Sequence, residues 1–427
     1  MRVARARLTD SRAGDRAPPP TLHASRDPLP AKYFPPMPPR RRKRLDPASF
    51  NLPVERLRQG GSTDRAAARV REILLTTQPA TRATVQVTAE RTCILGGTDE
   101  SVALLKLCVD DWNSLAVYAL YDGDHAEPGD TVMTLEGPYE AFAPLETLIL
   151  GTLARRTRVT TNARAFVEAA RPKLVMAFPA RHDHWILQPG DAVAAQIGGA
   201  LTISGDPPVA GPGKQPTFVP PLALLPHSLI GAYGGNTKAA AQAFAAHVTG
   251  RDGPAATGAD VGATGLGTAN GTPVSSPSIT NRDAQVVVPV DYDNDAVGTA
   301  LIVARALESQ LWGVQLATSE NLVDASIIPA MGTFVPTGVN PNLVWNVRNA
   351  LDAEGFGDIK ILASSGMTLD RIQYFEEEGV PVDAYGIGAA LLAGRTGFTA
   401  ALVQLDRPLR LRIGSELRPN PRLERVK

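Results

Sequence analysis

The chain has 427 residues, a length that exceeds one ordinary hydrophobic core and favours two domains. Its 44% hydrophobic and 20% charged residues are typical of a soluble globular protein. The formal charge is zero overall, but residues 1–50 carry ten Arg and two Lys against four Asp, a charge of +8. The remaining residues therefore carry −8, which argues against a nucleic-acid surface as the main function of the folded part.

The sequence predicts a cytoplasmic protein without a membrane segment. No apolar run approaches the roughly 18–20 residues that cross a bilayer. The arginines of the N-terminus are not followed by the apolar stretch of a secretory signal. The two cysteines, Cys93 and Cys108, lie in apolar contexts and are expected to be buried, reduced thiols.

Residues 1–47 are rich in proline and arginine, with PPP at Pro18–Pro20, PPMPP at Pro35–Pro39 and RRRKR at Arg40–Arg44. This segment has too little apolar surface to offset the entropy of ordering, so we expect a disordered tail. The basic run could contact nucleic acid or an anionic partner. A solvated tail, or extra residues from a start codon assigned too far upstream, is the interpretation that we favour.

Residues 48–150 predict a compact α+β domain. Its predicted elements, in chain order, are a helix at Ala66–Leu75, a strand at Ala83–Ala89, a helix at Glu100–Asp111, a strand at Val117–Tyr121 and a hairpin over Asp130–Phe142 that turns at Gly137-Pro138.

Residues 151–394 predict a second domain of alternating strands and helices. Two helices are expected first, at Leu145–Leu153 and Asn162–Ala170. Short apolar runs then alternate with helical stretches, at Leu174–Phe178, Val286–Val290, Trp312–Leu316, Ile359–Ala363 and Val382–Tyr385. Such alternation indicates parallel β/α units, so the predicted fold class is α/β, with enough units for a TIM-like barrel. Residues 251–283, rich in Gly, Ala, Thr and Ser, predict a flexible insertion between barrel units.

Two late strands each run into a glycine turn. The strand at Ile359–Ala363 is followed by Ser364-Ser365-Gly366 and by Thr368, a predicted helix N-cap. The pattern recurs at Val382–Tyr385, followed by Gly386-Ile387-Gly388. Backbone N–H groups and helix N-termini at such joints face an anion, and glycine lets the anion approach closely. The two joints favour a phosphate site, although glycine also serves turn conformation alone.

Acidic residues cluster at Asp291-Tyr292-Asp293-Asn294-Asp295, directly after the strand at Val286–Val290. Carboxylates at the carboxyl end of a barrel strand point toward the site and can hold Mg²⁺ or a sugar hydroxyl. A polar turn in which an Asp caps the following helix is an equally good interpretation.

The histidines and arginines give weaker signals. A single histidine such as His227, between apolar residues and a helical run, is more often structural than catalytic. His182 and His184 resemble a metal pair, but no third ligand is positioned by spacing, so we expect no zinc. Arg181 is a better candidate, because its planar fork suits a carboxylate or phosphate. Glu376–Glu378, and less surely the pair Arg155-Arg156, are expected on solvated helix faces.

Several stretches together resemble the nicotinate phosphoribosyltransferases, in an order that is specific to that family. The likeness spans residues 60–425. The stretches that carry it are Glu136-Gly137, Leu145-Glu146-Thr147, Leu153–Thr157, Phe178–His182, Pro226–Ile230, Val290–Asp293, Gly313–Val323, Gly338–Gly388 and Pro419–Glu424.

The resemblance implies a type II phosphoribosyltransferase fold, with an N-terminal α/β domain beside an irregular α/β barrel. It also implies that the C-terminal segment, residues 395–427, completes the N-terminal domain. Family members join nicotinate to phosphoribosyl pyrophosphate with Mg²⁺, which gives nicotinate mononucleotide and pyrophosphate. ATP hydrolysis drives the reaction through a phosphorylated histidine. The resemblance also implies a homodimer, because such sites are completed across a subunit interface.

The same resemblance assigns roles to particular residues. The phosphorylated histidine would be His227, and Asp291 and Asp293 would lie beside it or beside the metal, which Asp293 would bind. Phe178 would stack on the pyridine ring, and Arg181 would pair with the donor's phosphates or the nicotinate carboxylate. The residues that would surround the 5′-phosphate are Ser364, Gly366, Gly386 and Gly388.

The implied chemistry is physically consistent. The anomeric C–O bond breaks toward an oxocarbenium-like state, so the protein needs no strong nucleophile of its own. Neutralising the departing pyrophosphate and placing the ring nitrogen in line supply the catalysis. A histidine that accepts a phosphoryl group needs a neutral imidazole, whose other nitrogen an Asp orients.

Several positions depart from the family pattern. The family's Val-Arg-Leu-Asp is Val314-Gln315-Leu316-Ala317 here, which removes a charge pair expected near the ribose and phosphates. The family's Asp-x-Tyr, whose Tyr covers the ring from a neighbouring subunit, is Asp64-Arg65-Ala66. The remaining departures are Ala223-Leu224 before the Pro-His motif, and Ser365 and Ala389 in the phosphate loops.

Three functions follow from these observations. The first is an active, ATP-coupled nicotinate phosphoribosyltransferase. The second is a degenerate family member that binds a phosphosugar or nucleotide, or pairs with an active paralogue, without turnover; Ala66, Gln315, Ala317 and Ala389 motivate it. The third is a quinolinate phosphoribosyltransferase or an enzyme for another pyridine, which would need extra basic residues for a second carboxylate and no phosphorylation of His227.

Overall fold

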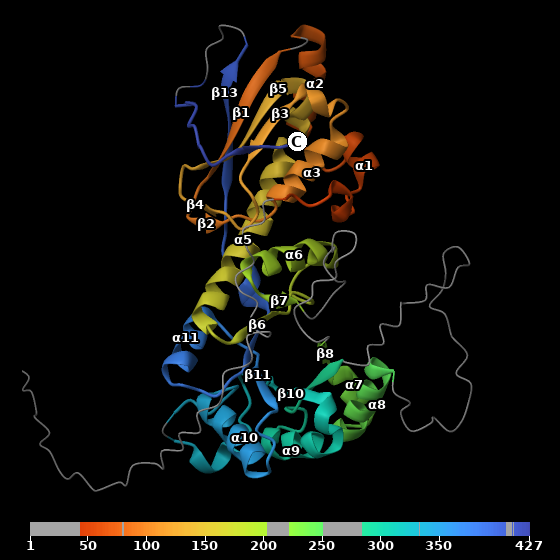
Figure 1. Cartoon of the computed structure of the whole chain (residues 1–427), viewed down its shortest axis with the longest axis vertical. Helices are drawn as coiled ribbons and strands as arrows, with labels where there is room; N and C mark the ends of the chain where they lie inside the picture. The colour runs from red at the N-terminus through yellow and green to blue at the C-terminus, as the bar shows by residue number, and fades with distance from the viewer. Residues whose placement is uncertain are drawn as a thin grey trace, which may run out of the picture.

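The computed structural model describes residues 43–78, 81–202, 222–250, 284–332, 334–406, 412 and 414–427. An antiparallel sheet with its helices forms one half of an elongated molecule, and a parallel sheet with its helices forms the other (Figure 1). The predicted disordered tail up to residue 42 and the predicted insertion at 251–283 lie outside the described residues. Of the tail's last residues, Arg44 is held by an ion pair of 2.9 Å with Asp99 and by hydrogen bonds to two backbone carbonyls.

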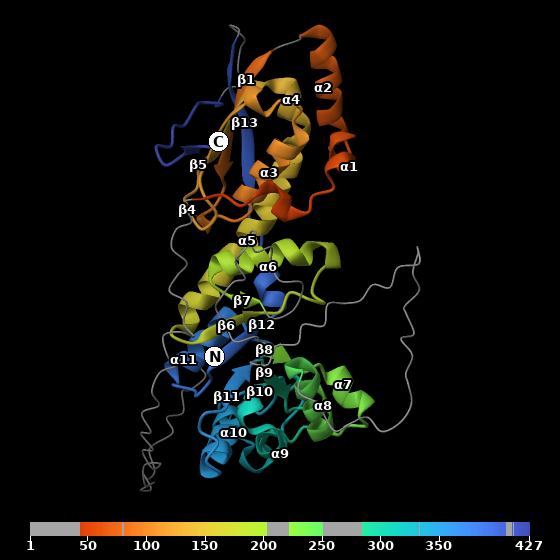
Figure 2. The ribbon, with the colours of Figure 1, turned by 45° about the vertical axis from the view of Figure 1, so that its right-hand side comes forward.

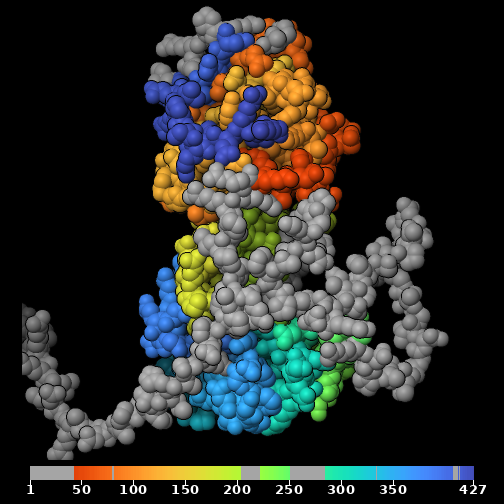
Figure 3. Space-filling view, in the orientation of Figure 1, coloured from red at the N-terminus to blue at the C-terminus, as the bar shows by residue number. Residues whose placement is uncertain are grey.

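The antiparallel sheet has five strands in the order β13-β1-β5-β3-β14. The C-terminal segment supplies both of its edge strands, because β13 pairs with β1 and β14 pairs with β3. In Figure 3 this segment lies in blue on the surface of that half. The strands span Arg82–Ala89 (β1), Ala116–Ala119 (β3), Thr131–Pro138 (β5), Phe398–Leu405 (β13) and Glu424–Arg425 (β14).

The predicted hairpin over 130–142 is wrong. β5 pairs with β1 and β3, and the chain enters a helix at Tyr139 instead of returning as a strand. Gly137 stays extended in β5, where a side chain would meet Leu115. The other elements of this half are α1 (Val54–Arg58), α2 (Arg65–Thr77), α3 (Thr98–Cys108), α4 (Tyr139–Phe142) and the two-stranded pair β2 (Cys93–Ile94) and β4 (His125–Ala126).

One long helix, α5, spans Glu146–Ala170 and links the two halves (Figures 1 and 2). The prediction of two separate helices is therefore wrong. The polar run in its middle does not break the helix, because its side chains have partners. Thr157 is buried and donates a hydrogen bond of 3.0 Å to the carbonyl oxygen of Gly96.

The parallel sheet has seven strands in the order β7-β6-β12-β11-β10-β9-β8. Among the described residues, β7 and β8 are its two edges and do not pair with each other, so closure into a barrel stays a prediction. All neighbouring strands are parallel, so their carboxyl ends lie along one edge. The strands span Leu174–Ala177 (β6), Leu201–Thr202 (β7), Leu222–Leu224 (β8), Gln285–Pro289 (β9), Leu311–Leu316 (β10), Lys360–Ala363 (β11) and Ala384–Ile387 (β12).

Six helices of the described chain accompany this sheet, and most begin with a side-chain cap. Asn236, Asp295, Asn340 and Thr368 each accept a hydrogen bond from a backbone N–H of the first turn of their helices. The prediction that Thr368 caps a helix from Leu369 is thus confirmed. The helices are α6 (Gln188–Gly198), α7 (His227–Ala232), α8 (Thr237–Thr249), α9 (Ala296–Leu307), α10 (Pro341–Ala353) and α11 (Leu369–Glu377).

Each half has its own apolar core. Leu105, Leu120 and Met133 are fully buried under the antiparallel sheet, and Val288, Val314 and Ile361 are fully buried in the parallel sheet. The prediction of an α/β fold is confirmed. No helix within the described ranges is long and apolar enough to cross a membrane. Cys93 is buried and Cys108 is half-buried, and both are free thiols.

Candidate functional site

The carboxyl edge of the parallel sheet brings His227 and Asp291 together. His227 is the first residue of α7, after β8, and Asp291 follows β9. The Nε2 atom of His227 lies 2.9 Å from Oδ1 of Asp291. The side chain of His227 is 44% exposed, whereas that of Asp291 is 13% exposed. The imidazole ring is therefore accessible to solvent, and the carboxylate that holds it is largely buried.

Two charged groups set the pKa of His227 in opposite directions. The hydrogen bond that the imidazole donates to Asp291 is the main influence and raises the pKa of His227 above its ordinary value. Partial burial and the cation of Arg181 lower it. Arg181 follows β6, near the opposite end of the strand order. The parallel sheet is curled like half a barrel, which brings its two ends toward each other.

The acidic run after β9 divides into different roles. Asp291 contacts His227, while Asp295 caps α9 by accepting a hydrogen bond of 3.0 Å from the backbone N–H of Gly298. The interpretation of this run as a turn in which an Asp caps the following helix is confirmed for Asp295, whereas a role in holding Mg²⁺ or a sugar hydroxyl stays a prediction. Asp293 is exposed between them, and Tyr292 packs against Gly231 and Gly235, beside α7.

Phe178 and Gly386 are neighbours at the ends of β6 and β12. A side chain at Gly386 would overlap the ring of Phe178 and meet Cβ of Ser364 at 3.0 Å. Gly386 lies within β12, not after it as predicted, since the strand extends to Ile387. The absence of a side chain at Gly386 therefore leaves room for the ring of Phe178, which the resemblance expects to stack on the pyridine.

The protein's own side chains lie over the other two predicted phosphate glycines. The ring of His182 lies where a side chain of Gly388 would be, and the carboxylate of Glu320 lies where one of Gly366 would be. Ser365 and Gly366 both have left-handed backbone, with φ of 64° and 63°. The carboxylate of Glu320 is 3.6 Å from Nη1 of Arg371, which also donates a hydrogen bond to the carbonyl oxygen of Gly366.

Ser364 is buried and its hydroxyl is used within the protein. Its Oγ accepts a hydrogen bond of 2.9 Å from Nε2 of Gln315 and donates one of 3.1 Å to the carbonyl oxygen of Leu316. Gln315, one of the departures from the family pattern, thus forms a neutral contact between β10 and the first glycine joint. At the second joint, Ala389 begins a four-residue 3₁₀ helix, and at the other end of the chain Ala66 is in the first turn of α2.

Arg155 and Arg156 are not on a solvated face, and that prediction is wrong. Arg156 pairs with Glu100 at 2.8 Å and with Asp191 at 2.8 Å, and Arg155 pairs with Asp191 and Asp183, both at 2.6 Å. Asp191 is fully buried between the two arginines. This network joins α3, α5 and α6 and so stabilises the junction between the two halves. The ion pair of Arg155 with Asp183 also holds the loop after β6 against α5.

A magnesium ion is compatible with the oxygen donors that the site offers. In the part of the chain that the structure describes, no three His, Cys, Asp or Glu residues are grouped as a metal site. Mg²⁺ commonly takes one or two carboxylates and completes its shell with water and substrate phosphates. Asp293, exposed beside Asp291 at a strand end, fits that mode of binding and does not need a protein cage.

Three residues of this edge were not singled out from the sequence. Glu320, Arg371 and Tyr292 all follow the carboxyl end of a strand or begin the next helix. Arg371 could have been noticed, because a cation in the first turn of a helix opposes the helix dipole and needs another reason to be there. Its reason is the ion pair with Glu320 and the contact to the Gly366 loop.

A family profile matches part of the antiparallel half. Residues 70–157 match the family described as "Quinolinate phosphoribosyl transferase, N-terminal domain". This stretch runs from α2 into α5 and contains the five strands β1 to β5. Among curated proteins, no sequence matches the chain significantly.

Solved structures of similar shape cover most of the chain. Nicotinate-nucleotide pyrophosphorylase from Pyrococcus furiosus is 24% identical, with a TM-score of 0.62 over 85% of this chain and 79% of that one. The nicotinate-nucleotide pyrophosphorylase of Francisella tularensis is 12% identical, with a TM-score of 0.54 over 85% and 98%. Human nicotinic acid phosphoribosyltransferase is 15% identical, with a TM-score of 0.51 over 82% and 76%. The predicted resemblance is confirmed at the level of the fold, which is that of the type II phosphoribosyltransferases.

Proposed function

We propose that this chain is an ATP-coupled nicotinate phosphoribosyltransferase of NAD salvage, which joins nicotinate to phosphoribosyl pyrophosphate and releases pyrophosphate. The observation that carries the proposal is the pair of His227 and Asp291, at 2.9 Å on the carboxyl edge of a parallel sheet. An accessible imidazole held by a carboxylate is the arrangement that a phosphorylated histidine needs. The relation in fold to human nicotinic acid phosphoribosyltransferase supports the same reading.

His227 would accept the γ-phosphoryl group of ATP. With its proton on Nε2, the imidazole donates a hydrogen bond to Asp291 and keeps a lone pair on Nδ1. Nδ1 then attacks the phosphorus and ADP leaves, and Asp291 stabilises the positive charge that develops on the ring. Water later cleaves the N–P bond and restores the histidine. Arg181, whose charge acts on His227, would offset the negative charge of the phosphates.

The other end of the edge would hold the sugar phosphate and the pyridine. Phe178 would stack on the ring of nicotinate, beside Gly386. The backbone around Gly366 and Gly388 would bind the 5′-phosphate at the first turns after β11 and β12. The hydroxyl of Ser364 is used by Gln315 and Leu316, so we assign Ser364 the role of shaping this loop. Glu320 would turn away from Gly366 when the phosphate binds, because the two negative charges repel.

Mg²⁺, when bound with the pyrophosphate, would neutralise the charge of the leaving group. Asp293 is the carboxylate that we assign to it, with Asp291 kept for His227. Arg181 would add a second positive charge. We also propose that the curled sheet closes into an irregular barrel, that the chain forms a homodimer, and that it works in the cytoplasm.

A quinolinate phosphoribosyltransferase is the second candidate. The family profile matched at residues 70–157 and the similarity in fold to two nicotinate-nucleotide pyrophosphorylases favour it. Quinolinate has a second carboxylate, which needs a second cation near Phe178. Within the described residues Arg181 and His182 are the basic groups at the end of β6, and His182 lies against Gly388. The His227–Asp291 pair has no role in that reaction, which is why nicotinate is placed first.

A degenerate binder is the remaining alternative. The family's Arg and Asp are replaced by Gln315 and Ala317, and Gln315 is bonded to Ser364. If the lost charge pair is essential, the protein would bind the phosphosugar without turnover.

Release of pyrophosphate by the purified chain with phosphoribosyl pyrophosphate and Mg²⁺ tests the proposal. We expect release with nicotinate, stimulated by ATP, and none with quinolinate. Release with quinolinate that is indifferent to ATP would establish the second candidate instead. A folded protein that binds phosphoribosyl pyrophosphate but releases nothing with either pyridine would establish the degenerate binder.

A further inference from the structure

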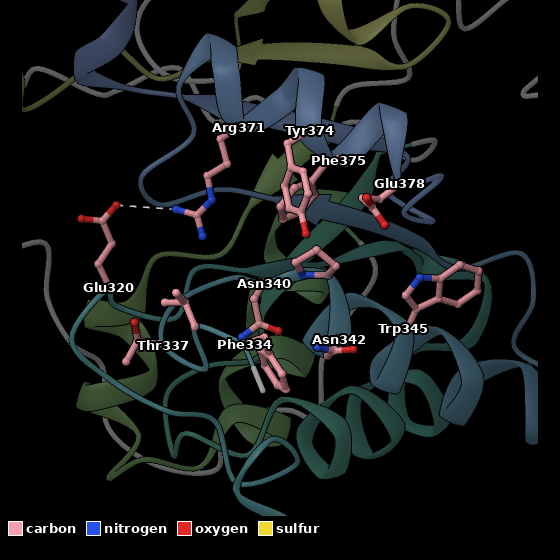
Figure 4. A pocket seen from close by; sticks show the side chains of 12 residues that line it. Glu320, Phe334, Thr337, Asn340, Asn342, Trp345, Arg371, Tyr374, Phe375 and Glu378 are labelled. Carbon is pink, nitrogen blue, oxygen red and sulfur yellow. Dashed lines mark ion pairs between the residues drawn. The ribbon is translucent and has the colours of Figure 1, made fainter. Parts of the chain in front are cut away.

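Glu320 and Arg371 face each other at one end of an open pocket of about 690 Å³ between α10 and α11 (Figure 4). Glu320 lies in the loop after β10, and Arg371 is in the first turn of α11. Their charged groups are 3.6 Å apart, which is an ion pair too long for a hydrogen bond. The side chain of Glu320 is 64% exposed, whereas that of Arg371 is 24% exposed. Glu320 therefore has room to turn into the open pocket, and a pair so exposed costs little to separate.

Arg371 is fixed beside the loop of Gly366 by hydrogen bonds of its own. Its Nη1 donates to the carbonyl oxygen of Gly366 at 3.3 Å, and its Nη2 donates to the carbonyl oxygen of Val339. A guanidinium carries more N–H donors than these two bonds use, and the others have no hydrogen-bond acceptor among the described residues. Arg371 is thus a positioned cation with donors to spare.

The space over Gly366 lies between the two charged groups. A side chain at Gly366 would overlap the carboxylate of Glu320 and would lie 2.9 Å from Nη1 of Arg371. A ligand atom in the same place would have to displace the carboxylate, and it would then contact the guanidinium directly.

Two groups at this place are incompletely satisfied by the protein. Partial burial lowers the pKa of Arg371 below its ordinary value, and the carboxylate of Glu320 opposes that shift. Thr318, two residues before Glu320, is 2% exposed, and its hydroxyl has no hydrogen-bond partner within the described ranges. A buried hydroxyl without a partner is unfavourable, so the loop from Thr318 to Glu320 has a physical reason to rearrange when a ligand binds.

We propose that Arg371 binds the 5′-phosphate of the sugar and that Glu320 competes with the phosphate for this arginine. A phosphate displaces the carboxylate because it carries more charge and accepts the guanidinium's hydrogen bonds, which Glu320 at 3.6 Å does not. The exchange selects a phosphorylated sugar, since a neutral hydroxyl does not displace the carboxylate. This inference rests on the phosphosugar site of the proposed function, but not on the pyridine or on ATP.

Calorimetric titration of the full-length protein with ribose 5-phosphate, and with ribose, tests the role of Arg371. We expect Arg371→Gln to weaken the binding of ribose 5-phosphate about tenfold or more at low salt, and less at high salt. Arg371→Lys keeps the charge and should keep most of the affinity. Equal losses in the two variants would show that Arg371 only holds the Gly366 loop, and ribose that binds as tightly as ribose 5-phosphate would also overturn the proposal.

Arg305→Gln is the matched control and should bind ribose 5-phosphate like the wild type. Arg305 also forms an ion pair with a glutamate, Glu354, but it lies in the last turn of α9, which leads back to the amino ends of the strands. A thermal melt of each variant checks that the fold is kept.

A double variant tests the competition. Glu320→Gln is expected to strengthen the binding of ribose 5-phosphate about three- to tenfold at low salt. When Arg371 is already Gln, the same change should give less than about a twofold gain, because Glu320 then has no arginine to occupy. Equal gains with and without Arg371 would mean plain repulsion and would overturn the competition.

Pyrophosphate release separates this inference from the proposed function. A protein that binds ribose 5-phosphate through Arg371 but releases no pyrophosphate with any pyridine would refute the proposed function and leave this inference standing. Turnover with nicotinate in which Arg371→Gln leaves the KM for phosphoribosyl pyrophosphate unchanged would do the reverse.

Discussion

The two ends of the parallel sheet's carboxyl edge differ in how ready they are for a ligand. At β8 and β9, His227 is exposed and held by Asp291. At β11 and β12, protein side chains occupy the space over Gly366, Gly386 and Gly388. If the proposed function is correct, the first end holds its histidine in place before any ligand binds, whereas Glu320 at the second end would have to move to admit a phosphate. The experiments below test that contrast, in order of expected effect.

His227→Ala is expected to have the largest effect. It removes the proposed phosphoryl acceptor, so ATP hydrolysis and ATP-stimulated turnover should fall by roughly 100-fold or more. The side chain is partly exposed and lies at a strand end, so the melting temperature should change little. Phosphate release and a thermal melt measure the two effects. His125→Ala, in β4 of the antiparallel half, is the control and should leave both activities unchanged. If the His227 variant kept full ATP coupling, His227 would not be the phosphoryl acceptor.

Asp291→Asn is expected to lower ATP hydrolysis about 10- to 100-fold and to change its pH dependence. The neutral imidazole is the nucleophile, so hydrolysis rises with pH through the pKa of His227, which Asp291 raises. Without the carboxylate that pKa falls, and the rise should move to lower pH. The pair also stabilises the fold most at acid pH, and this contribution is lost as the pH rises through the raised pKa.

Asp293, two residues after Asp291, provides the control for the Asp291→Asn experiment. Asp293→Asn should leave the pH profile in place and instead raise the Mg²⁺ concentration that turnover needs. If both variants shift the pH profile equally, Asp291 has no special relation to His227.

Gly386→Ala tests the end of the edge at β11 and β12, where protein side chains lie over the glycines. The added methyl group would overlap the ring of Phe178, so we expect a loss of stability of about 1–3 kcal/mol and a higher KM for the pyridine. Gly151→Ala is the matched control, since a side chain at this position of α5 would meet nothing. That control should be neutral or stabilising by up to about 1 kcal/mol. Chemical denaturation compares the two, and equal stabilities would mean that Phe178 is free to move.

Glu320→Gln has the smallest expected effect and the opposite sign. Removing a carboxylate beside Gly366 should strengthen the binding of phosphoribosyl pyrophosphate by about three- to tenfold at low salt, and less at high salt. Calorimetric titration measures it, with Glu378→Gln as a control that does not touch the loop. Weaker binding by Glu320→Gln would show that this carboxylate helps to hold the ligand.

The sequence predicted the longer strands of both halves, β1, β3, β6, β9, β10, β11 and β12, because apolar runs report local structure. The short strands β2, β4, β7, β8 and β14, and the edge strand β13, were not predicted. The sequence placed Asp291 and His227 by resemblance, but their contact joins residues far apart in the chain and depends on the neighbouring strands β8 and β9. The hairpin after Asp130 was wrong because Gly137-Pro138 reads as a turn, although β5 is held on both sides by partners distant in sequence. Arg155 and Arg156 were predicted to be solvated because their partner, Asp191, is distant in sequence and reaches them only when α6 packs against α5. What lies over the glycines could not be predicted, since Glu320 and His182 reach them through side-chain orientation alone.

The central claim is that His227 carries the phosphoryl group of ATP. Incubating the full-length protein with ATP labelled at the γ-phosphate, then locating the label by mass spectrometry at neutral pH, tests it directly. We predict an acid-labile phosphate on His227 that is lost when phosphoribosyl pyrophosphate and nicotinate are added and is absent from Asp291→Asn at short times. ATP-stimulated turnover without label on His227 would contradict the account.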